Sequence, residues 1–202
     1  MGTITTNFAN GLTTNGVLGA STINDNSISN ITSIVGGGAL KLISSQTASA
    51  SASISFTSGI DSTYKSYMFK FINIHGSSDG YQFAFQGSTD GGSNYNTAIT
   101  STFFHSKHDE ADSQTGLEYV SSFDLAQGTS FQPITHFIGT DNDQSSSGTL
   151  HLFSPSSTTY VTHFIANTSD YYYNDYNMHN FIAGYLNTTS AINAVQFKML
   201  SG

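Results

Sequence analysis

The sequence predicts an all-β protein, an antiparallel β-sandwich of jelly-roll-like form preceded by an extended N-terminal arm. From residue 40 onward, apolar and polar residues alternate in short runs, which is typical of strands with one buried face. Turn-forming residues separate about ten such runs. Before residue 40, single apolar residues stand among Ser, Thr, Asn and Gly, which are poor helix formers.

Residues 1–39 form the predicted arm. Their apolar residues are three to five positions apart, and a lone segment of this kind buries too little apolar area to offset its ordering entropy. We therefore expect the arm to lie on another surface or to wind with copies of itself. The residues expected to anchor it are Ile4, Phe8, Leu12, Ile23, Ile28 and Ile31. Gly36–Gly38 reads as the hinge into a second domain, 40–202.

The second domain contains the predicted strands. Ser49–Thr57 shows the clearest alternation, whereas Tyr67–Ile74 is apolar on both faces and predicts a central strand. The remaining strand candidates are 81–86, 97–105, 117–125, 133–139, 149–153, 160–166, 181–186 and 192–200. The long polar stretches near 106–116, 140–148 and 167–180 are predicted loops, which in a sandwich gather at its ends, where binding usually occurs.

Composition excludes several functions. The chain has 202 residues and a formal charge of −8, with five Lys, no Arg and no Cys. A thiolate metal site or disulfide framework is therefore impossible, and binding to nucleic acid or an anionic membrane is disfavoured. No apolar run approaches the roughly 20 residues that span a bilayer. We expect no cofactor, and no Gly-x-Ser-x-Gly elbow or paired glutamates indicate an enzyme.

Two sets of histidines could bind a metal. His105, His108, Asp109 and Asp112 could present nitrogen and oxygen ligands from one loop, although a solvated acidic loop with two surface histidines is the favoured interpretation. If the 154–158 turn is symmetric about Ser157, His151 would face His163 across a hairpin. Half-buried strand histidines are the alternative there.

The segment 170–179 is the most suggestive for ligand binding, because aromatic rings interleaved with Asp and Asn suit neutral sugars. The candidate ligand residues are Tyr171, Tyr172, Tyr173, Asp175, Tyr176 and His179. Core packing and a subunit contact remain alternative roles for these tyrosines.

Several stretches resemble a group of fibre-like structural proteins of tailed bacteriophages, notably phages of marine bacteria. They are 42–69, Asp141-Asn-Asp-Gln-Ser, Ser147-Gly-Thr-Leu-His-Leu-Phe-Ser-Pro-Ser-Ser and Asn187-Thr-Thr-Ser-Ala-Ile-Asn-Ala-Val-Gln-Phe. Residues 22–34 are similar to low-complexity shafts that join phage fibre heads to the particle. The resemblance covers about residues 40–202 and carries no catalytic signature.

The resemblance implies a non-enzymatic protein on the virion surface. We expect the arm to dock on other virion proteins, of capsid or tail, and the sandwich to meet a host surface or glycan. A homotrimer or another symmetric assembly is expected. The alternatives are a capsid decoration or head-fibre protein that stabilises the shell and, less favoured because Glu is scarce, a tailspike depolymerase.

Overall fold

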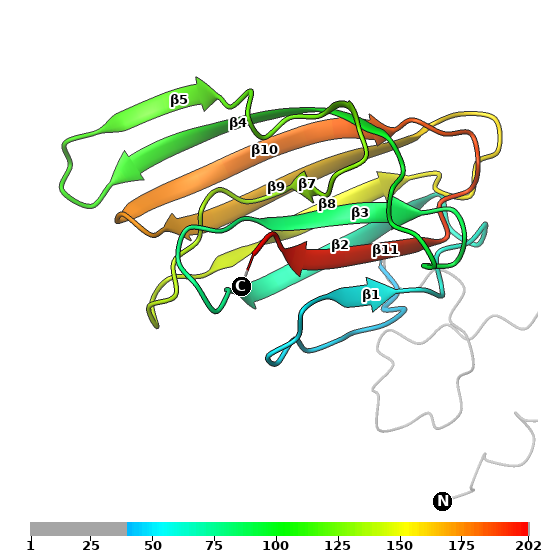
Figure 1. The fold of residues 1–202 in the computed structure, drawn as a ribbon, viewed down its shortest axis with the longest axis horizontal. Helices are drawn as coiled ribbons and strands as arrows, with labels where there is room; N and C mark the ends of the chain where they lie inside the picture. The colour runs from blue at the N-terminus through cyan, green and yellow to red at the C-terminus, as the bar shows by residue number, and fades with distance from the viewer. Residues whose placement is uncertain (1–39, 202) are drawn as a thin grey trace, which may run out of the picture. The chain divides into compact units, whose positions relative to one another are not determined.

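The computed structural model describes residues 40–201, which form an all-β sandwich of two antiparallel sheets (Figure 1). The predicted anchoring residues of the arm lie outside the described part. The chain divides into Met1–Leu42 and Ile43–Gly202, and the sandwich belongs to the second unit. Within 40–201 no helix is long and apolar enough to cross a membrane.

The smaller sheet, sheet A, has four strands in the order β1-β11-β3-β7. They are β1 (Ile54–Phe56), β11 (Ala194–Met199), β3 (Phe83–Ser88) and β7 (Gln132–Pro133). The larger sheet, sheet B, has seven strands, six of them in the order β2-β8-β9-β10-β4-β5. They are β2 (Ser66–Ile74), β8 (Ser146–Phe153), β9 (Thr162–Tyr172), β10 (Tyr176–Leu186), β4 (Ile99–Asp109) and β5 (Thr115–Tyr119), and β6 (Ala126–Gly128) pairs with β4.

The strand order is that of a jelly roll with one additional hairpin. When β8 and β9 are set aside, the sheets read β1-β11-β3-β7 and β2-β10-β4-β5, and most connections cross between them, as in paired Greek keys. The β8–β9 hairpin lies between β2 and β10. It therefore widens sheet B and gives this sheet a larger outer face than sheet A.

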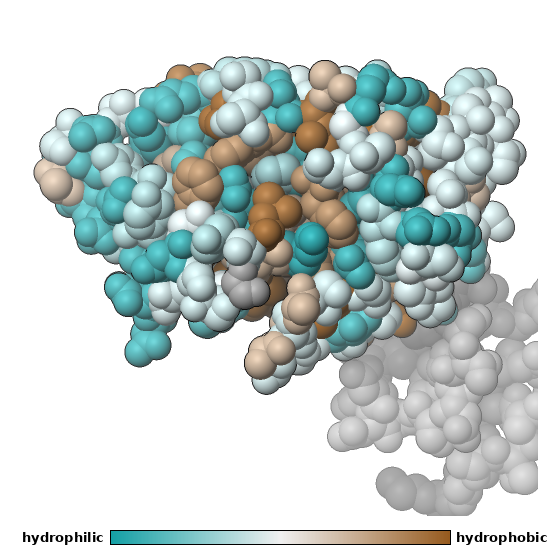
Figure 2. Space-filling model, in the orientation of Figure 1, coloured by the Kyte–Doolittle hydropathy of each residue, from teal (hydrophilic) through white to brown (hydrophobic). Residues whose placement is uncertain are grey.

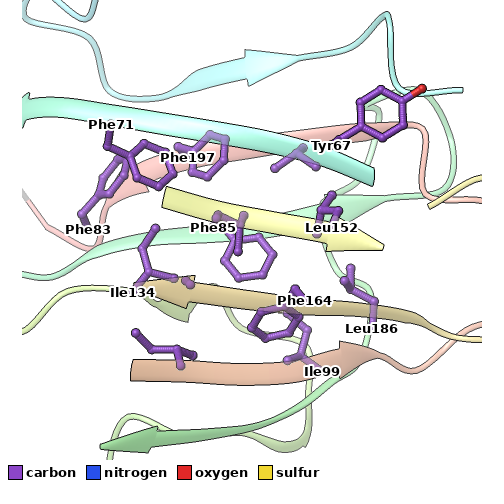
Figure 3. Packing of buried hydrophobic residues seen from close by; sticks show 14 of the residues in the cluster. Tyr67, Phe71, Phe83, Phe85, Ile99, Ile134, Leu152, Phe164, Leu186 and Phe197 are labelled. Carbon is purple, nitrogen blue, oxygen red and sulfur yellow. The ribbon is translucent and has the colours of Figure 1, made fainter. Parts of the chain in front are cut away.

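The core fills the space between the sheets. Phe71 of β2 lies 5.2 Å from Phe83 of β3 and 5.0 Å from Phe197 of β11, measured between ring centroids. Figure 3 shows this aromatic group beside the aliphatic part of the core, which includes Ile99 and Leu186. Each of these residues occupies an inward position of its strand, as period-two alternation requires.

The exterior is wetted mainly by uncharged polar groups, because only 9% of residues are charged. On the side of the molecule drawn in Figure 2, hydrophobic residues gather near the middle and hydrophilic ones surround them.

The strands differ from the prediction mainly in their ends. β9 and β10 continue to Tyr172 and from Tyr176, so the expected loop 167–180 is wrong and is instead the end of a long hairpin. The expected strand 133–139 is reduced to β7 and an isolated bridge at Ile138. The polar residues in 167–180 form regular strands because their inward side chains hydrogen-bond to one another. The alternation of apolar residues does not reveal these bonds.

Candidate binding site at one end of sheet B

The turn between β4 and β5 forms one wall of the site. The Asp109 carboxylate accepts hydrogen bonds from the backbone N–H groups of Ser113 (2.9 Å) and Gln114 (2.7 Å), which closes the turn. The hydroxyl of Ser113 donates a further bond to Asp109, and this bond is the main reason that the pKa of Asp109 is lowered. Asp112 at the tip has a φ of 53°, the left-handed conformation that Asp tolerates well.

The ends of β9 and β10, next to their tight turn, line another side of the site through Ser169, Tyr171 and Asn177. Asp175 donates its N–H to the carbonyl of Tyr172 (3.0 Å), and its own carbonyl accepts the N–H of Glu110 (3.0 Å), so the two turns are joined. Tyr171 donates its phenolic O–H to Glu110 Oε1 at 2.9 Å. This hydrogen bond is the main cause of the raised pKa of Tyr171.

An open pocket of about 580 Å³ lies among the β4–β5 turn, the ends of β9 and β10 and the start of β8. Its lining residues are His108, Asp109, Glu110, Asp112, Ser145, Ser147, Ser169, Asp170, Tyr171 and Asn177. The pocket thus draws residues from all three stretches that the sequence predicts to be loops. It combines carboxylates, an amide, hydroxyls and a phenol, which are groups that can bond to the hydroxyls of a neutral sugar.

The six predicted ligand residues do not lie together at one site. Tyr171 lines the pocket, and Asp175 lies beside it, 3.3 Å from the Tyr171 hydroxyl. Tyr172 is on the opposite face of β9, where its ring packs 5.1 Å from that of His136 and 5.7 Å from that of Tyr176. The remaining two are outside the pocket lining: Tyr173 packs on Tyr172, and His179 lies against Phe181 on the outer face of β10.

The four residues predicted as metal ligands are also not brought together. His108 Nε2 lies 3.1 Å from Asp112 Oδ1, and Asp109 is occupied by its own turn. His105, by contrast, is 2% exposed and points into the sandwich, because residues three apart in a strand face opposite sides. Among residues 40–201 no group of three or more His, Asp or Glu is placed to hold a metal ion.

The predicted histidine pair across the β8–β9 hairpin is wrong in register. His163 is opposite Phe153, and His151 is opposite Ile165. The hairpin is centred one residue later than expected, which shifts the pairing by two positions and leaves both imidazoles on the outer face.

A buried polar cluster beneath the pocket was missed by the sequence reasoning. Asp170 is 1% exposed and accepts hydrogen bonds from Ser146 Oγ (2.5 Å), the backbone N–H of His136 (2.7 Å) and the amide of Asn180. Burial raises the pKa of Asp170 to about 7, although these hydrogen bonds oppose the shift. His105 packs on His136, with ring centroids 5.0 Å apart.

One signal could have revealed this cluster. Continuing the alternation of β9 beyond Ala166 places Thr168 and Asp170 on the inward face, and Thr168 donates its hydroxyl to the carbonyl of Ile134 at 2.6 Å.

Comparison of the chain with protein-family models, curated proteins and solved structures found no match.

Proposed function

We propose that this chain is a non-enzymatic surface protein of a bacteriophage particle that attaches to host-surface glycans through the pocket at the end of sheet B. The observation that carries the glycan part is the meeting of three polar segments, the β4–β5 turn and the ends of the β8–β9 and β9–β10 strand pairs, around one open pocket of about 580 Å³. The phage part rests on the resemblance of 40–202 to fibre-like virion proteins. Docking on capsid or tail proteins through the arm, 1–39, belongs to the same proposal.

The pocket suits a neutral sugar better than an anion. Glu110, Asp109 and Asp112 bring carboxylates to its wall, and no lysine lines it. Carboxylate oxygens accept hydrogen bonds from sugar hydroxyls, whereas they repel sulfated, phosphorylated or acidic saccharides. Asn177 adds an amide that both donates and accepts, and Tyr171 adds an aromatic ring.

The β8–β9 hairpin is the main structural support for this assignment. It supplies Ser147, Ser169 and Tyr171, which line the pocket, and it is the part of sheet B that extends the jelly-roll arrangement. The site is thus built on regular strands, which hold side chains more precisely than loops do.

Glycan binding is tested with the full chain against a panel of neutral and acidic bacterial surface polysaccharides. We expect binding to a neutral member, and at least a tenfold loss of affinity, roughly 1.4 kcal/mol or more, in Asn177→Ala and in Glu110→Gln. The first variant removes the amide, and the second replaces one charged acceptor oxygen with an NH2 donor. Tyr160→Ala is the matched control, since Tyr160 is 76% exposed on the turn between β8 and β9 and lies outside the pocket.

Two results would overturn the proposal. One is unchanged affinity in both pocket variants, and the other is preference for acidic polysaccharides. Release of reducing sugar from the bound polysaccharide would instead identify an enzyme.

A further inference from the structure

A row of polar side chains crosses the inner face of sheet B near its pocket end. Thr168 of β9, Asn180 of β10, His105 of β4 and Glu118 of β5 are successive partners in the strand register, and these four strands lie side by side (Figure 1). The first three residues are 2% exposed or less, whereas the Glu118 side chain is 51% exposed. The row therefore runs from the interior of the sandwich to its surface.

Four buried polar atoms at this row have no hydrogen-bond partner among residues 40–201. They are Asn180 Oδ1, both ring nitrogens of His105, and Nδ1 of His136. His136 belongs to the segment 134–138 that follows β7, and its ring centroid lies 5.0 Å from that of His105. Unpaired polar atoms in a protein interior cost free energy, and nearly all of them are paired with protein groups or ordered water. The four atoms therefore indicate a partner that the side chains themselves do not supply.

The orientation of the Asn180 amide is fixed by its neighbours. Its Nδ2 donates to Thr168 Oγ1 at 3.0 Å and to the carboxyl group of Asp170. The Thr168 hydroxyl donates its own proton to the carbonyl of Ile134 at 2.6 Å, so its oxygen is left to accept from Asn180. Asn180 Oδ1 is therefore an acceptor that needs a donor.

The two imidazoles need partners of both kinds. Burial lowers the pKa of His105 and of His136 below the usual 6.5, so both rings are neutral at pH 7. A neutral imidazole has one N–H that donates and one nitrogen that accepts. His105 Nε2 lies 3.7 Å from Glu118 Oε2, which is beyond hydrogen-bond distance, and Lys107 Nζ holds Glu118 Oε1 at 2.6 Å. The Glu118 carboxylate therefore does not pair with the ring directly.

Water is the ligand that meets these requirements, because it both donates and accepts hydrogen bonds. One molecule can donate to Asn180 Oδ1 and also bond to a nitrogen of His105, since cross-strand neighbours on one face are close together. A metal ion would need a third His, Asp or Glu, and no such group of three is placed to hold one in the part of the chain that the structure describes. An apolar ligand would leave all four atoms unpaired.

We propose that the sandwich holds an internal water site between Asn180, His105 and His136. Its water joins β4 and β10 of sheet B to the segment 134–138 on the opposite layer, and it connects the imidazoles through Asn180 to the buried Asp170. None of the three residues at the site lines the glycan pocket, so the two proposals are tested separately.

A high-resolution crystal structure of the full chain tests the site directly. We expect density for a water oxygen within hydrogen-bond distance of Asn180 Oδ1 and of one nitrogen of His105. A dry contact, in which His105 bonds directly to His136 or Glu118 with no density between them, overturns the proposal. Anomalous scattering from a metal ion at the same place also overturns it.

Magnetic relaxation dispersion of water oxygen-17 tests the site in solution, because it counts water molecules that stay bound to the protein. His105→Phe removes both ring nitrogens and keeps an aromatic ring, and His151→Phe makes the same change on the outer face of sheet B as the control. We expect the count to fall by at least one in His105→Phe and to match wild type in His151→Phe.

Near-ultraviolet circular dichroism establishes that both variants are folded. An unchanged count in folded His105→Phe overturns the proposal. If that variant does not fold, the wild-type crystal structure decides by itself.

Discussion

At the scale of single residues, the buried polar cluster contains two ionisable groups, Asp170 and His136, that change the stability of the fold with pH in opposite directions. The pKa of Asp170 is raised to about 7 from 3.8 by burial, so the folded state keeps a proton that the unfolded state releases between those values. The pKa of His136 is lowered to about 4 from 6.5, mainly by burial and then by His105, so the unfolded state binds the extra proton. Stability from Asp170 therefore falls as pH rises from about 4 to 7, while stability from His136 rises across 4 to 6.5.

This opposition predicts the effect of Asp170→Asn on pH dependence. Without the carboxyl group, only the histidine contribution remains, to which the lowered pKa of His105 adds in the same direction. Between pH 4 and 6.5 the unfolding free energy of the variant should increase more than that of wild type, and the two increases should differ by on the order of 2 kcal/mol. Urea unfolding of both proteins at several pH values gives the slope of the unfolding free energy against pH for each. The contributions of the other carboxyl groups are common to both proteins and cancel in the difference between the slopes. Parallel profiles would contradict the assignment.

At the scale of elements, β10 and the β8–β9 hairpin approach their neighbours closely at glycines. A Cβ on Gly148 of β8 would lie 2.3 Å from the carbonyl oxygen of Asn167, and one on Gly184 of β10 would lie 2.4 Å from that of Thr100. Both obstructing atoms belong to the backbone of adjacent strands, so relief requires the strands to separate.

Gly148→Ala and Gly184→Ala should each destabilise the protein by about 2 kcal/mol or more. The control is Gly116→Ala in β5, whose added Cβ would meet the flexible end of Lys107 at 3.2 Å and should change stability by less than about 0.5 kcal/mol. Chemical denaturation of the three variants tests this. Equal stabilities would show that the strands adjust more freely than the close contacts indicate.

The bounds of the strands show which parts of the fold the sequence predicts and which it does not. The period-two pattern located most of the strands, and 67–74 was predicted almost to its observed bounds, Ser66–Ile74. The expectation that it is a central strand is wrong, because β2 lies at the edge of sheet B and exposes Met68 and Ile72 on its outer face. The pattern failed beyond Ala166, because Thr168 and Asp170 are polar residues at inward positions. Hydrogen bonds with other elements offset the cost of burying them, and a local sequence pattern holds no information about those partners.

At the scale of the whole molecule, Phe197 connects the two sheets. Its ring lies 5.1 Å from Phe69 and 5.0 Å from Phe71, both on β2 of sheet B. It is 3% exposed and also packs against rings of its own sheet. Its removal opens a cavity between the layers rather than at an edge.

Phe197→Ala should cost about 3–5 kcal/mol of unfolding free energy, which combines lost burial with the cavity left behind. Tyr160→Ala, at a side chain 76% exposed, should cost less than about 0.5 kcal/mol. Calorimetry on the two variants compares them directly, and a small effect at Phe197 would mean that the sheets repack around the gap.

The sequence by itself determined the class of fold and the distribution of charge, because alternation, turn residues and composition are local properties. It also indicated which loops carry the acidic and aromatic groups. Tertiary structure alone decided that Tyr171 joins Glu110 at a pocket, that His105 and Asp170 are buried, and that Phe104 aligns with Phe181. The physical reason is register: alternation assigns each side chain to a face, but only pairing between strands distant in the chain decides its neighbours on that face.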